Sequence, residues 1–71
     1  MKRRFEFVGG SSAKFYELSV QGTTVTIQYG RLGTSGQASA RSFADSGAAI
    51  KHAEKLIREK LGKGYRECVA S

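Results

Sequence analysis

Much of the N-terminal half of the chain alternates apolar and polar side chains with a period of two, which is the pattern of half-buried β-strands. Four such runs predict strands over Arg3–Val8, Lys14–Gln21, Thr24–Tyr29 and Ala38–Phe43. Glycine-rich and serine-rich segments separate the runs, and Gly22 and Thr23 stand where a tight hairpin turn belongs. Because the connections are short, we expect the strands to form an antiparallel meander.

The apolar period changes to that of a helix after Asp45, whose carboxylate can cap a helix by accepting hydrogen bonds from the backbone amides that follow. Apolar residues then recur at spacings of three and four, which predicts one amphipathic helix with a single apolar stripe of Ala49, Ile50, Ala53, Leu56, Ile57 and Leu61. Gly62 or Gly64 can end this helix in a left-handed conformation. Tyr65–Val69 is predicted to return as a short edge strand.

These elements predict an α+β fold, a small curved antiparallel β-sheet of four to five strands with one long amphipathic helix packed across one face. Seventy-one residues suffice for one domain, so residues 1–71 are expected to form a single unit. Because one helix covers only one face of a sheet, we expect the opposite face and its loops to carry the function.

Composition argues against several classes of protein. The chain has no long apolar run and no signal-peptide stretch, which favours a soluble, cytoplasmic protein. Cys68 is the single cysteine, so it forms no internal disulfide, and together with the single histidine, His52, it cannot make a zinc site. No paired carboxylates or catalytic triad can be assembled. We therefore expect no enzyme activity, no catalytic residue, no metal, no cofactor and no small-molecule substrate.

The charge of the chain points to an anionic partner. Twelve Lys and Arg face six Asp and Glu, which gives a net charge of +6. Residues 45–71 are nearly balanced, whereas no acidic residue lies between Gly22 and Ala44. A polyanion would meet least repulsion in that segment, and the field of the uncompensated arginines would accelerate its approach. The alternative is a charge surplus that serves solubility alone.

The third predicted strand ends at Tyr29, which begins an unusual run, Tyr29-Gly30-Arg31, and a loop of Leu32-Gly33-Thr34-Ser35-Gly36-Gln37 follows. Gly30 permits a close approach of another backbone that a side chain would block. The loop offers backbone amides and two hydroxyls, a composition able to surround a phosphate. The alternative is a glycine loop that only reverses the chain.

This run resembles the WGR domain, a module named for a Trp-Gly-Arg trio followed by a hydrophobic residue, Gly and Thr. The likeness extends over nearly the entire chain, through Lys14-Phe15-Tyr16-Glu17, Arg41-Ser42-Phe43, the basic helix around Lys55–Lys60, and Gly64-Tyr65. Some bacterial members of the family are small free-standing proteins. The family fold, a curved antiparallel sheet with a helix across it, agrees with the fold predicted from periodicity.

The resemblance implies a role in binding DNA. In the DNA-dependent poly(ADP-ribose) polymerases, the WGR module contacts DNA near a strand break, and the tryptophan of the trio packs on a terminal nucleotide. By this resemblance Tyr29 would be the stacking residue, Arg31 would hold a phosphate or a neighbouring domain, and Gly30 would let the backbone pass close. Tyrosine stands here in place of the family's tryptophan, which we expect to weaken affinity rather than abolish it.

We therefore expect a non-catalytic nucleic-acid-binding module that favours DNA ends or nicks, with contacts from Tyr29, Gly30, Arg31, Thr34, Arg41 and Lys14. The partner would be DNA or another polyanion, and no membrane is implicated. The alternative function is a protein-protein interaction module that bridges partner domains through the same exposed sheet face and Arg31.

The DNA hypothesis requires the ring of Tyr29 to project from the face of the sheet that the helix leaves uncovered. The alternative for Tyr29 is a core position, because it has the same parity as the apolar residues of its strand. The alternative for Arg31 is a surface ion pair with Glu6 or Glu17. For the other basic residues of the set, the alternative is an ordinary solvated charge on a strand.

Overall fold

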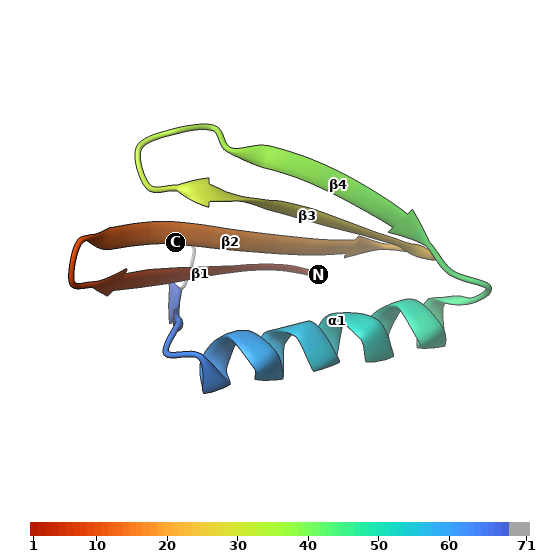
Figure 1. Cartoon of the computed structure of the whole chain (residues 1–71). Coiled ribbons are helices and arrows are strands. Elements are labelled where there is room, and N and C mark those ends of the chain that lie inside the picture. Colours follow the sequence, from red (N-terminus) through yellow and green to blue (C-terminus); the bar gives the residue numbers. More distant parts are fainter. Residues whose placement is uncertain (69–71) are drawn as a thin grey trace.

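The computed structural model describes residues 1–68, which form one sheet and one helix. The elements are β1 (Lys2–Gly9), β2 (Ser12–Gln21), β3 (Thr24–Arg31), β4 (Gln37–Ser42), α1 (Ser46–Gly62) and β5 (Arg66–Cys68). All neighbouring strands pair antiparallel in the order β4-β3-β2-β1-β5. Figure 1 shows α1 lying across one face of this curved sheet. The predicted α+β fold is confirmed.

The strand boundaries differ from the prediction by at most two residues. β2 begins two residues earlier than predicted, at Ser12, and β3 continues for two residues beyond Tyr29. Gly30 pairs with Phe15 and Arg31 pairs with Lys14, so the run lies inside the sheet rather than in the loop that follows it. The C-terminal strand is confirmed as an edge strand beside β1, and Val69, which we had included in it, lies outside the described residues.

Local signals at both ends of α1 account for its bounds. The Asp45 carboxylate accepts a hydrogen bond of 2.7 Å from the backbone amide of Ala48, which confirms the predicted cap. At the other end Gly64 adopts a φ of +97°, and the amide of Tyr65 donates to the carbonyl of Lys60. Of the two glycines considered, Gly64 is thus the left-handed one. This turn directs Tyr65 back towards the sheet.

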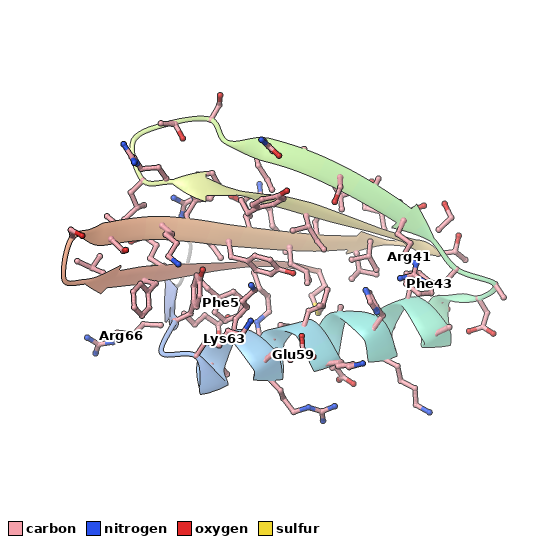
Figure 2. All side chains as sticks on the ribbon, viewed as in Figure 1. Phe5, Arg41, Phe43, Glu59, Lys63 and Arg66 are labelled. Atoms are coloured by element: carbon pink, nitrogen blue, oxygen red, sulfur yellow. The ribbon has the colours of Figure 1, made fainter. Side chains whose placement is uncertain are left out.

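The main core lies between α1 and the sheet. Phe5, Leu18 and Val25 are fully buried there, and each contributes about 1.5–3 kcal/mol relative to an exposed position. The helix contributes three buried residues, Ala49, Ala53 and Ile57. Two of these are alanines, whose small side chains let the helix lie close to the strands. Figure 2 shows Phe5 in this layer between β1 and α1.

The helix follows β2 more closely than β3. On β2 the helix-facing residues Val20, Leu18 and Tyr16 all stay buried along the strand. On β3 the corresponding row becomes progressively exposed, from Val25 at 1% to Tyr29 at 43%. The helix-side face of β3 therefore opens towards the end of the strand, and β4 is exposed along its whole length.

The β3–β4 loop makes a second, smaller core on the face that α1 does not cover. Phe15 is adjacent to the helix-facing Tyr16, so it points to the opposite face, yet it is only 4% exposed. The loop folds back over it, and a Cβ on Gly30 would lie 2.7 Å from the Cα of Gly36. The Thr34 hydroxyl donates a 2.7 Å hydrogen bond to the Arg31 carbonyl and fixes the loop.

We predict that Gly36→Ala lowers the free energy of unfolding by about 2–4 kcal/mol. Its φ is +68°, and a Cβ there would overlap the carbonyl group of Tyr29 and lie 2.9 Å from Cζ of Phe15. Gly33→Ala is the matched control, because Gly33 also has a positive φ, of +91°, but a Cβ there meets nothing within 4 Å. Urea denaturation followed by circular dichroism measures both losses, and equal losses would contradict the second core.

Candidate functional site

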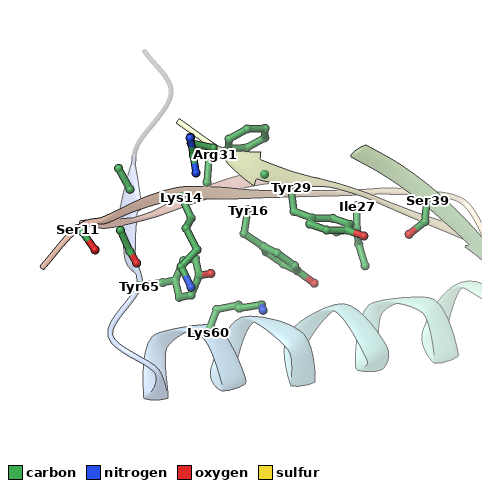
Figure 3. A pocket seen from close by; sticks show the side chains of 13 residues that line it. Ser11, Lys14, Tyr16, Ile27, Tyr29, Arg31, Ser39, Lys60 and Tyr65 are labelled. Carbon is green, nitrogen blue, oxygen red and sulfur yellow. The ribbon is translucent and has the colours of Figure 1, made fainter. Parts of the chain in front are cut away.

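A cleft of about 590 Å³ opens on the helix-side face, between the strands β2 and β3 and the last turns of α1 (Figure 3). Its chemically distinctive lining residues are Lys14, Tyr16, Tyr29, Arg31, Lys60 and Tyr65. We call the space between these six residues the tyrosine cleft. Every ionisable lining side chain other than the tyrosines is a Lys or Arg, and no Asp or Glu lines the cleft. The cleft therefore combines aromatic surface with positive charge.

Tyr29 lies on the helix-side face, because it pairs directly with Tyr16 across β2 and β3. The expectation that its ring projects from the uncovered face was therefore wrong. A sealed core position is wrong as well, since the residue is 43% exposed at the point where α1 diverges from β3. Its hydroxyl donates a 3.2 Å hydrogen bond to Oε1 of Gln37, its partner on β4, which holds the ring at the cleft.

Arg31 and Lys14 are direct cross-strand partners at the end of the sheet. Figure 3 shows Lys14 extending into the cleft towards Tyr65, whereas Arg31 stays at the rim beside the end of β3. The Lys14 ammonium lies 5.3 Å from the centre of the Phe7 ring. Like charges directly opposite each other destabilise a sheet, so an anion bound near Arg31 and Lys14 would reduce their repulsion.

Arg31 does not pair with Glu6 or Glu17, the two acids considered for it. Both carboxylates instead bind Arg4 at 3.2 Å, and Glu17 also binds Lys2 at 3.0 Å. Within residues 1–68, no carboxylate lies within 4 Å of the Arg31 guanidinium. The charge of Arg31 is thus available to a ligand.

Lys60 of α1 completes the basic lining, and sequence reasoning missed it. Its ammonium lies 4.5 Å from the ring centre of Tyr16 and 5.3 Å from that of Tyr65. Burial, together with the nearby charges of Lys63 and Lys14, lowers the pKa of Lys60, although Glu59 opposes the shift. The available signal was its spacing, since Lys60 follows the buried Ile57 by three residues and so continues the apolar stripe.

Tyr16 and Tyr65 form the floor of the cleft beneath Lys60. Their ring centres are 6.5 Å apart in an edge-to-face arrangement, and Tyr65 also packs 5.5 Å from Phe7. Burial, the Glu59 carboxylate and the neighbouring Tyr65 raise the pKa of Tyr16, so its hydroxyl stays protonated at neutral pH. The floor is therefore a neutral aromatic surface below two ammonium groups.

Comparison with known proteins identifies the family. The family model described as "WGR domain" matches residues 1–70. The chain belongs to the WGR domain family. This confirms the resemblance drawn from the sequence. WGR domains are generally non-catalytic modules, and membership of the family is consistent with nucleic-acid binding in general.

Two curated relatives come from Escherichia coli K12. Protein YehF is 43% identical over 65 residues, and the uncharacterised protein YfeS is 34% identical over 67 residues. The matches cover 92% and 94% of this chain but only 24% and 28% of those proteins, so the chain spans about a quarter of their length.

A solved structure shows the same arrangement of strands and helix. The crystal structure of a protein from Bacteroides fragilis matches this WGR domain with a TM-score of 0.94 and 48% sequence identity. The match covers 97% of this chain and 20% of that one. In the part of this WGR domain that the structure describes, no helix has the length and hydropathy needed to span a bilayer.

The structure brings together four of the six predicted site residues of this WGR domain. Tyr29, Gly30, Arg31 and Lys14 all line the tyrosine cleft. Thr34 does not, because its hydroxyl closes the β3–β4 loop instead of facing a ligand. Arg41 lies towards the other end of β4, opposite Val25, with its guanidinium 5.2 Å from the Phe43 ring (Figure 2).

The face of the sheet that we expected to carry the function is electrostatically compensated. Lys2, Arg4, Glu6 and Glu17 form a network of ion pairs there. A hydrogen bond from Lys2, reinforced by Arg4, lowers the pKa of Glu17. Three cations without an ion pair within residues 1–68, namely Lys14, Arg31 and Lys60, line the tyrosine cleft, which lies on the helix side of the sheet and not on the face that we expected to carry the function.

We predict that Glu17→Gln lowers the free energy of unfolding by up to about 1 kcal/mol at pH 7. Because the folded-state pKa of Glu17 is depressed, the stabilisation is present above the unfolded-state pKa and disappears as the pH falls through the folded-state value. The two proteins should therefore converge in urea denaturation once the pH falls below the folded-state pKa of Glu17. Glu54→Gln is the control, since no cation of residues 1–68 lies within 4 Å of Glu54. A loss that is independent of pH would contradict the prediction.

Proposed function

We propose that this WGR domain is a nucleic-acid-binding module that prefers DNA ends or nicks. The observation that supports this most is the acid-free tyrosine cleft, which places one exposed aromatic ring beside three unpaired cationic side chains. Nucleic acid offers both matching groups, a flat base or sugar and a row of phosphates. At an end or a nick, a terminal nucleotide is free of one stacking neighbour and can meet the ring.

Tyr29 is the residue that would cover such a nucleotide. Its ring is exposed and is held by the hydrogen bond to Gln37, so little conformational freedom is lost on stacking. Contacts between an aromatic ring and a base contribute about 1–3 kcal/mol per base and tolerate different rings. Because Tyr29 has a phenol ring where the family has the indole ring of tryptophan, we expect the same mode of binding with a lower affinity for the nucleic acid.

Arg31 would meet the phosphates at the rim, while Lys14 and Lys60 act from inside the cleft. Arg41 stands four residues along β4 from Gln37, which is about 13 Å in an extended strand. Arg41 could therefore contact only a nucleic-acid strand that runs along β4 towards the start of α1. Contacts of this kind position a backbone and do not read bases, so we expect little sequence preference.

We predict that Tyr29→Ala removes the preference for ends while basal electrostatic binding remains. The variant should fold, because the side chain is 43% exposed. Tyr29→Phe should keep the preference, since it retains a ring that can stack. Tyr29→Trp should strengthen binding to ends, since it restores the larger ring of the family's tryptophan. Fluorescence anisotropy with labelled blunt, nicked and end-free duplexes measures the difference. Undetectable binding of the natural sequence to all three duplexes would refute the proposed function.

We predict that salt weakens binding in proportion to the phosphates contacted. With about three contacts, raising salt from about 50 to 200 mM should weaken binding about 40-fold. Arg31→Gln should reduce the slope of log affinity against log salt by about 0.9. Arg58→Gln removes the same charge from the exposed outer side of α1 and is the control. Equal effects of the two substitutions would mean that only net charge matters.

A protein-interaction module is the second candidate. The observation that favours it is β4, which is exposed along all six residues and forms the outer edge of the sheet within residues 1–68. An extended segment of a partner could add to this edge by main-chain hydrogen bonds, with Arg31 nearby as an anchor. Under this proposal Tyr29→Ala changes binding to no duplex, and Arg31→Gln releases the partner domain.

A further inference from the structure

We propose that the tyrosine cleft also binds a free nucleoside monophosphate, with the phosphate between Lys14 and Lys60 and the base against Tyr29. This goes beyond the proposed function, because it needs neither a DNA end nor a second nucleotide. It also departs from the sequence-based expectation that the protein has no small-molecule ligand. The inference uses Tyr29, Lys14 and Lys60, which the proposed function also uses, but it does not require Arg31 at the rim.

The first argument is the shape of the cleft. Its volume of about 590 Å³ lies within the range of about 300–1,000 Å³ that is usual for small-ligand sites. Walls come from two directions, since β2 and β3 form one side while Lys60 of α1 and Tyr65 form the other. Figure 3 shows these side chains converging on one space between the sheet and the helix. A cleft with these two walls has room for a single nucleotide.

The second argument is the state of the two ammonium groups. Lys60 rests on the rings of Tyr16 and Tyr65, and Lys14 lies over Phe7, so aromatic faces hold both cations without neutralising them. No carboxylate of the described chain lies within 4 Å of either one. Burial is the main cause of the lowered pKa of Lys60, and repulsion from Lys63 and Lys14 lowers it further. A phosphate monoester carries a charge of about −1.5 to −2 near pH 7 and would relieve this repulsion.

The third argument is the other end of the cleft, which is apolar and aromatic rather than charged. Ile27 lies beside Tyr29 in the same row of β3, and Ser39 of β4 adds a hydroxyl at the wall. Inorganic phosphate would fill only the lysine end and leave this surface bare. A nucleoside would fill only the aromatic end. A ligand that joins an aromatic base to a phosphate matches both ends together, and Tyr29 would accept any base.

The test compares three probes on the 71-residue chain, namely AMP, adenosine and inorganic phosphate. We expect AMP to bind at least about tenfold more tightly than either of the others in isothermal titration calorimetry. Lys60→Gln should weaken AMP by about tenfold and leave adenosine unchanged, because it removes only the phosphate contact. Lys60→Arg should restore most of the AMP affinity. Tyr29→Ala should weaken AMP and adenosine alike.

The control is Lys55→Gln, which removes one positive charge from an exposed position of the same helix and should leave AMP binding unchanged. Two results would overturn the inference: AMP that binds no more tightly than inorganic phosphate, or Lys60→Gln that weakens adenosine as much as AMP. Duplex titrations on the same samples separate the two proposals. Binding of AMP without binding of DNA ends would refute only the proposed function, and binding of DNA ends without AMP would refute only this inference.

Discussion

The structure depends on one geometric constraint, that a single 17-residue helix has to cover a sheet of five strands. A helix is about 10 Å wide and strands are about 4.8 Å apart, so only about two strands can be sealed beneath it. The helix follows β2, where Leu18 is fully buried, and diverges from β3, where Tyr29 is 43% exposed. The tyrosine cleft is the space that this divergence leaves open.

Electrostatics reinforces the difference between the two faces. On the uncovered face, Arg4 lies between the carboxylates of Glu6 and Glu17, so positive and negative charges cancel locally. At the cleft, Lys14 and Lys60 have aromatic rings as neighbours, and rings attract a cation without cancelling its charge. The cleft therefore keeps the positive charge of Lys14 and Lys60 uncompensated, whereas the charges on the other face are paired. A cleft lined by charges of one sign attracts oppositely charged ligands.

The sequence predicted the sheet and the helix, because a period of two residues in a strand, or of three to four in a helix, shows which side chains share a face. The cap was predicted from the carboxylate of Asp45. The periodicity also assigned Tyr29 the parity of the helix-facing row, yet we expected the opposite face. Parity cannot reveal where along a strand the helix diverges, and only the path of α1 does so. Lys60 was missed for a related reason: its place at the cleft depends on how α1 lies beside Tyr16 and Tyr65, which the sequence pattern does not record. The burial of Phe15 depends on a loop that returns over it, which no local pattern records.

The loop that seals Phe15 has a consequence for how relatives of this chain can vary in length. The backbones of Gly30 and Gly36 lie in close contact beside Phe15, so the loop between these two glycines has a fixed length. An insertion or deletion between these two glycines would move the loop away from the Phe15 ring and expose that ring to water. Natural length variation should therefore accumulate at other connections, and the spacing between these two glycines should be among the most constant features of relatives that keep an aromatic residue at the Phe15 position.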